Sequence, residues 1–62
     1  MLEYVKLILQ KVSFSRALFE KELRKAIRSL VPEELHQLRT WCYEQFAMRY
    51  RLLLDQQFAG VA

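Results

Sequence analysis

One stretch decides the fold: residues 32–58, which read PEELHQLRTWCYEQFAMRYRLLLDQQF. The stretch contains no glycine, and its one proline stands at the start, where a helix tolerates proline because the first amides lack an intrahelical partner. Glu33 and Glu34 follow in the first turn, where negative charge suits the helix dipole. We therefore predict one long helix from Pro32 to Phe58, about 40 Å long at roughly 1.5 Å per residue.

This predicted helix carries more apolar surface than its own chain can cover. Its large apolar side chains point in nearly every direction around the axis, and a helix that is apolar all round is normally buried on several sides. The exception is a thin polar stripe about 50° wide. It consists of Glu33, Gln37, Glu44, Arg51 and Asp55. Because a chain of 62 residues has little else with which to bury the rest, the sequence predicts a partner.

We expect this partner to contact aromatic and aliphatic side chains in the second part of the helix. The predicted interface residues are Tyr43, Phe46, Ala47, Tyr50, Leu53, Leu54 and Phe58. Twofold pairing of identical chains is the commonest way in which such a surface is closed. The predicted partner is therefore a second copy of the chain, in a homodimer or a higher oligomer, and the helix of another protein is the other partner we consider.

The chain length sets the second constraint on the fold. Residues 1–62 have room for a single small helical domain, and a domain of this size buries only about 60% of the surface of its unfolded chain. The lone cysteine, Cys42, excludes an intramolecular disulfide. One cysteine and one histidine also exclude a self-contained zinc site with four such ligands. Oligomerisation is the reinforcement that remains.

Two shorter helices are predicted before the long one. Over residues 2–12 the apolar residues share one face, with Tyr4 at its margin and Leu7 outside it. Over residues 16–30 the apolar residues form a narrow stripe, and Ser15 is a good N-cap because its hydroxyl accepts from a free amide of the first turn. The predicted fold class is all-α: three helices with very short connections, assembled as a dimeric helical bundle.

The helix of residues 16–30 also carries a basic face opposite its apolar stripe. Lys21, Arg24, Lys25 and Arg28 lie within about 100° of each other. Such a face is a signature of nucleic-acid binding, which makes a small nucleic-acid-binding regulator the alternative function. Acidic residues at helical spacing partly neutralise the face, the formal net charge is only +3, and no glycine turn of a helix-turn-helix motif follows. We therefore favour a solvated face.

Residues with catalytic or metal-binding chemistry are few. The Glu33-x-x-His36 pattern supplies ligands in di-iron bundles, but such sites need two patterns and two further carboxylates. Cys42 lies on an apolar helix face, where a cysteine is most often a small core residue. Trp41, Tyr43, Phe46 and Tyr50 are at the spacing of core or interface anchors. We expect no enzyme activity, no catalytic residue, no cofactor and no metal.

Membrane insertion and export are not expected. The longest aliphatic runs, residues 7–9 and 52–54, are far shorter than the roughly 20 residues that span a bilayer. Residues 1–3 place an acid where a signal peptide carries basic residues. The sequence thus predicts a soluble, cytoplasmic, non-enzymatic interaction module that binds itself or another protein helix.

Overall fold

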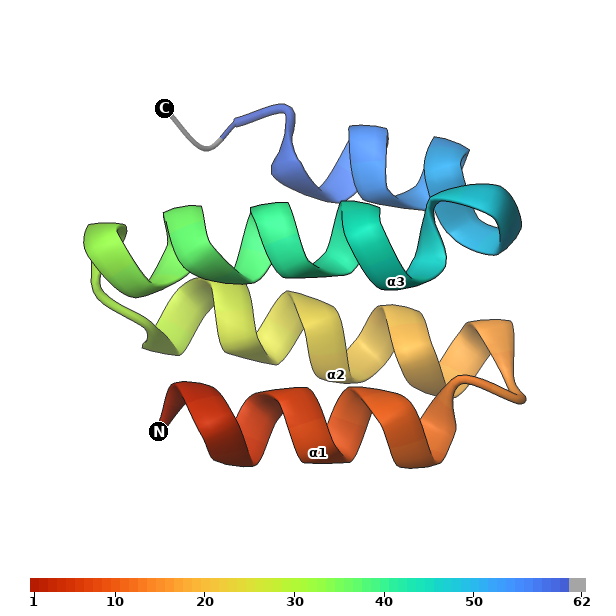
Figure 1. The fold of residues 1–62 in the computed structure, drawn as a ribbon, viewed down its shortest axis with the longest axis horizontal. Helices are drawn as coiled ribbons and strands as arrows, with labels where there is room; N and C mark the ends of the chain where they lie inside the picture. The colour runs from red at the N-terminus through yellow and green to blue at the C-terminus, as the bar shows by residue number, and fades with distance from the viewer. Residues whose placement is uncertain (61–62) are drawn as a thin grey trace. The chain divides into compact units, whose positions relative to one another are not determined.

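The computed structural model describes residues 1–60, and their regular secondary structure is all helical. The helices are α1 (Leu2–Val12), α2 (Arg16–Ser29) and α3 (Pro32–Phe58), as Figure 1 shows. The predictions of an all-α fold, three helices, short connections and a long third helix are confirmed, with helix bounds correct to within one residue. The chain divides into two compact units, Met1–Leu30 and a second unit that starts at Val31. That residues 1–62 act as one domain stays a prediction.

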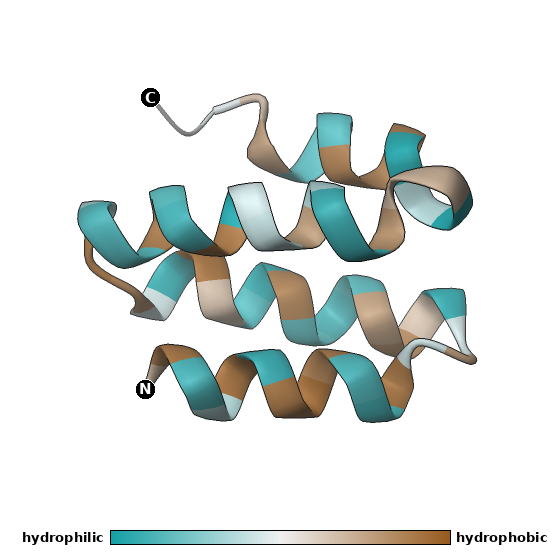
Figure 2. Cartoon of the chain, viewed as in Figure 1, coloured by the Kyte–Doolittle hydropathy of each residue, from teal (hydrophilic) through white to brown (hydrophobic). Residues whose placement is uncertain are grey.

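The first unit is a hairpin of α1 and α2. Ser15 is the N-cap of α2, since the backbone N–H of Leu18 donates to its Oγ at 3.3 Å, as predicted. Apolar and polar residues alternate along both helices at helical spacing (Figure 2). Leu9, Phe19 and Leu23 are fully buried, because the apolar face of each helix is turned inward.

The second unit contains a reversal that the sequence does not predict. Tyr50 has φ −128° and ψ 27°, which are not helical angles, and α3 turns back on itself there (Figure 1). The hydroxyl of Tyr43 donates a hydrogen bond to Oδ1 of Asp55, twelve residues later. In a straight helix these residues would be about 18 Å apart along the axis, too far for the two side chains to meet. The expectation of one unbroken 40 Å helix is therefore wrong.

We call residues 32–49 the first arm of α3 and residues 51–58 the second arm. Leu53, Leu54 and Phe58 of the second arm are buried, and so is Tyr50 at the break. In the first arm Leu35, Leu38 and Cys42 are buried, one above the other on one helix face. Because α3 reverses at Tyr50, its apolar second arm is buried without another chain.

Within residues 1–60, none of the helices combines the length and the apolar character required to cross a membrane.

Candidate interaction surfaces

The structure divides the predicted interface of α3 into two groups. Tyr43, Phe46 and Ala47 of the first arm are half-buried, whereas Tyr50, Leu53, Leu54 and Phe58 are buried. The second group is covered within the chain, because α3 reverses at Tyr50. That these seven residues contact a second chain stays a prediction, and it requires a change in the second arm.

Aromatic rings are nevertheless concentrated around the reversal. The ring centroids of Trp41 and Phe46 are 5.5 Å apart with an edge-to-face angle of 79°. Phe46 and Tyr50 follow at 6.3 Å and 50°. Aromatic pairs in such geometries add about 0.5–1.5 kcal/mol beyond the area that they bury. These contacts lie within the second unit and stabilise the first arm up to the break.

The predicted basic face of α2 is partly neutralised. Arg24 forms an ion pair with Glu20 at 2.7 Å, and Lys25 forms one with Glu22 at 3.7 Å. Lys21 and Arg28 are exposed on the same helix. All four cations belong to α2, and carboxylates on the same helix engage two of them. That this face binds an anion stays a prediction.

A polar hollow opens on the second unit beside the Tyr43–Asp55 hydrogen bond. Its volume is about 580 Å³, and its charged lining residues are Arg39, Glu44, Arg51 and Asp55. Two cations and two carboxylates leave this lining without net charge, so the hollow has no strong preference for an anion.

Tyr43 lines this hollow, and the pKa of its phenol is raised. The hydrogen bond that it donates to Asp55 raises the pKa of the Tyr43 phenol, and desolvation acts in the same direction. The guanidinium of Arg39 lies 5.2 Å from the centre of the Tyr43 ring, within cation–π distance. A raised pKa holds the phenol in its neutral, hydrogen-bond-donating form, which suits a structural contact between the arms and not a nucleophile or base.

The surroundings of Cys42 do not favour a reactive thiolate, and those of the Glu33-x-x-His36 pattern do not favour a metal site. Cys42 is fully buried, and burial raises the pKa of its thiol to about 12. The reactive thiolate is therefore strongly disfavoured. Glu33 and His36 are both exposed. In the part of the chain that the structure describes, no group of three or more His, Cys, Asp or Glu side chains could hold a metal ion.

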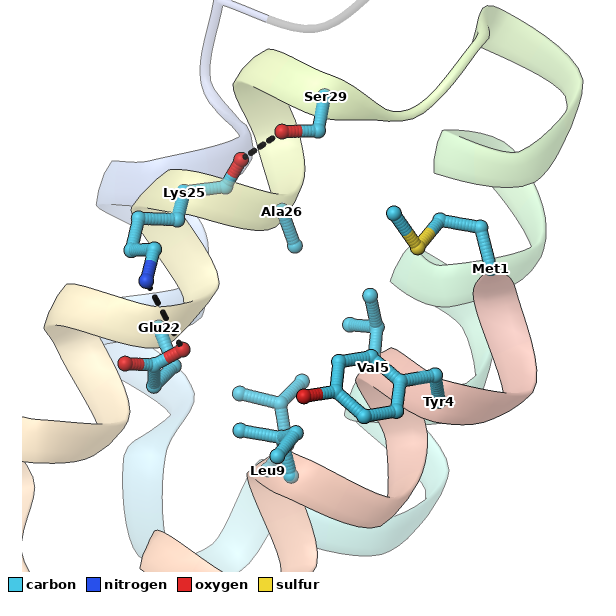
Figure 3. A pocket seen from close by; sticks show the side chains of 9 residues that line it. Met1, Tyr4, Val5, Leu9, Glu22, Lys25, Ala26 and Ser29 are labelled. Carbon is cyan, nitrogen blue, oxygen red and sulfur yellow. Dashed lines mark hydrogen bonds and ion pairs between the residues drawn. The ribbon is translucent and has the colours of Figure 1, made fainter.

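The structure adds a surface that the sequence did not single out, an apolar pocket between α1 and α2. Its volume is about 160 Å³. Side chains of Val5, Leu9 and Ala26 line it, with Met1 and Tyr4 at its rim (Figure 3). On the α2 side, Lys25 and Ser29 stand beside the pocket, and the Lys25–Glu22 ion pair closes that edge.

The rim of this pocket is unusually exposed for apolar residues. Met1 is 74% exposed and Tyr4 63% exposed, and Leu7 is exposed three residues further along α1. The spacing of three residues places these side chains along one strip of the helix. The available sequence signal was the position of Tyr4 at the margin of the apolar face and of Leu7 outside it. Neither position reveals a pocket, because the pocket also needs the small side chain of Ala26 on α2.

The size of the pocket limits what it can hold. Pockets for drug-sized ligands and cofactors measure roughly 300–1,000 Å³. An apolar cavity of about 150 Å³ holds a benzene-sized group. The α1–α2 pocket therefore has room for one large apolar side chain, such as a Phe or Leu from another helix, and not for a cofactor.

No protein-family model, no curated protein and no solved structure matches this chain.

Proposed function

We propose that the protein is a small non-enzymatic helical interaction module, and that its partner is a second copy of itself or, as the alternative partner, a helix of another protein. The observation that supports this proposal is the α1–α2 pocket with its exposed apolar rim. A pocket that accepts one anchor side chain, surrounded by apolar contacts, is the usual form of an interaction hot spot. A cytoplasmic location stays a prediction.

Three features of the charged and titratable residues favour binding over catalysis. The thiol of Cys42 is buried with a raised pKa, Tyr43 is held as a neutral donor, and the hollow beside it has no net charge. The nucleic-acid alternative draws support from the exposure of Lys21 and Arg28 on α2. It is the weaker proposal because carboxylates on the same helix engage the other two cations of that face.

The test is the mass of the protein in solution, measured by light scattering over a dilution series in the micromolar range. Self-association predicts at least twice the monomer mass, with dissociation on dilution. The variant Ala26→Leu fills the pocket, and Tyr4→Glu places a charge on its rim. We expect each to weaken self-association at least tenfold if the pocket holds the anchor residue of the second copy.

Two matched controls use exposed positions on the same helices. Ala17→Leu adds the same atoms to α2, and Gln10→Glu adds the same charge to α1, both away from the pocket. Neither control should change the mass. A wild-type protein that is monomeric at every concentration would contradict self-association, and equal effects of variants and controls would show that the pocket is not the contact.

A further inference from the structure

The reversal in α3 occurs where the sequence has no helix breaker. Sharp kinks almost always fall at Pro, at Gly or Ser pairs, at π-bulges or where a group inserts into the hydrogen-bond ladder. The residues next to Tyr50 are Met48, Arg49, Arg51 and Leu52, and all four types are ordinary helix formers. The local sequence therefore favours a helix that continues through residue 50. The contacts of the second arm, and not the backbone preference of the hinge, hold the reversal.

Those contacts join one arm of α3 to the other. Tyr43 of the first arm donates its hydrogen bond to Asp55 of the second, and Leu54 and Phe58 of the second arm are buried. The first arm can contact the second arm of its own chain or the second arm of another copy. The same side chains meet in both cases, and only the backbone conformation at Tyr50 differs.

We infer that a second copy of this chain exchanges the second arm. In the exchanged dimer α3 is straight at Tyr50, and the second arm of each chain packs on the first arm of the other. Exchange of an identical element is a low-cost route to a dimer, because it repeats the contacts of the monomer. The straightened hinge also regains helical backbone hydrogen bonds, which a break leaves unformed. This inference rests on the self-association part of the proposed function and not on the α1–α2 pocket, and it names the second arm of α3 as the segment through which self-association occurs.

The arrangement of side chains around α3 fits the exchange. In a straight helix, at about 100° per residue, one stripe about 80° wide contains five of the seven predicted interface residues. These are Tyr43, Ala47, Tyr50, Leu54 and Phe58. A straight α3 therefore presents these five residues on one side, while Phe46 and Leu53 lie outside the stripe. Two such helices, antiparallel, cover each other over the part of α3 that carries these five residues.

The hydrogen bond fixes the register of the exchanged pair. Tyr43 and Asp55 are equally distant in sequence from Arg49, which adjoins the break at Tyr50. In an antiparallel pair of straight helices that keeps this contact, the twofold axis passes close to Arg49. Tyr43 of each chain then meets Asp55 of the other, and the single contact of the monomer becomes two equivalent contacts.

A cross-linking experiment tests the exchange directly. The variants Tyr43→Cys and Asp55→Cys are prepared separately in a Cys42→Ala background, mixed, unfolded together, refolded and treated with a short bismaleimide. Because each chain carries one thiol, a 43–55 cross-link can form only between chains. We expect cross-linked dimer in the mixture at least tenfold above a matched mixture of His36→Cys with Asp55→Cys, since residue 36 lies about 10 Å from residue 43 along the helix.

A second variant changes only the hinge. Insertion of Gly-Ser-Gly after Tyr50 lets the second arm return to its own chain without a strained connection, and longer hinges disfavour exchange. We expect this insertion to convert the dimer to monomer. A wild-type dimer that gives no 43–55 cross-link above the control, or that stays dimeric with the insertion, overturns the exchange and leaves the proposed function standing. A wild-type monomer at every concentration overturns both.

Discussion

Replacing Leu54 by alanine should destabilise the protein far more than the same change two residues earlier. Leu54 is 0% exposed and Leu52 is 76% exposed, although both lie in the second arm of α3. Truncation of a buried leucine to alanine costs about 2–5 kcal/mol, because transfer energy is lost and a cavity remains. A surface substitution away from special features stays within about 0.5 kcal/mol, and alanine and leucine have similar helix propensities.

The size of this loss should be easy to measure. The free energy of unfolding of a chain of this length is expected to be about 3–9 kcal/mol at roughly 0.05–0.15 kcal/mol per residue. Leu54→Ala therefore removes about a fifth of it or more. At about 4–8 °C per kcal/mol for a domain of this size, Leu54→Ala lowers the midpoint of thermal unfolding by at least about 8 °C. Leu52→Ala moves the midpoint by no more than about 4 °C.

The assay is thermal and urea unfolding followed by circular dichroism, at two protein concentrations tenfold apart. Leu54 is buried in the folded-back chain and also in the exchanged dimer, so the difference between the two variants should appear at both concentrations. Equal midpoints for Leu54→Ala and Leu52→Ala would refute the burial pattern of the second arm, and with it the reversal at Tyr50. A larger loss for Leu52→Ala would do so as well.

Two further predictions follow from the titrating groups. The hydrogen bond to Asp55 raises the folded-state pKa of Tyr43 above its ordinary value of 10.0. The stabilisation is therefore complete below pH 10 and is lost as the pH rises through the raised pKa. Tyrosinate absorbance, with the Tyr43→Phe titration subtracted, should show the Tyr43 pKa falling toward its ordinary value in Asp55→Ala; an unchanged titration would contradict the contact. Cys42, with its pKa raised from 9.0 to about 12, has roughly a thousandfold less thiolate at neutral pH than a free cysteine. Reaction with a chromogenic disulfide should be at least a hundredfold slower in the folded protein than in urea, and comparable rates would show that the burial is wrong.

The fold class and helix bounds were predictable because they depend on local chemistry. The Ser15 cap, the proline at the first position of α3 and the 3.6-residue periodicity of α1 and α2 act within a few residues. Each of these signals favours one local structure, and the structure has a helix start at the Ser15 cap and another at Pro32. Burial in the first unit follows the same pattern, since Phe19 and Leu23 are apolar residues of α2 at helical spacing and both are fully buried.

The reversal at Tyr50 was not predictable from such signals, because no residue near it breaks a helix. A weaker signal was present in the phase of the apolar residues. The buried residues of the first arm, Leu35, Leu38 and Cys42, point about 115° away from the mean direction of the buried residues that follow the break. If residues 32–58 are one straight helix, these two directions mean that apolar surface faces nearly all sides. If they are two arms, the same directions mean that each arm has one apolar face to bury.

The hinge is thus the place where local preference and tertiary packing disagree. In most natural sequences the two levels agree, and exceptions tend to occur at functional sites. A proline or glycine near Tyr50 would have fixed the reversal, and its absence leaves a straight α3 accessible at the cost of the contacts between the arms. A second copy that restores those contacts removes that cost. In the exchange proposed above, the buried residues Tyr50, Leu53, Leu54 and Phe58 would be covered in either state, and the state of the hinge would decide which chain covers them.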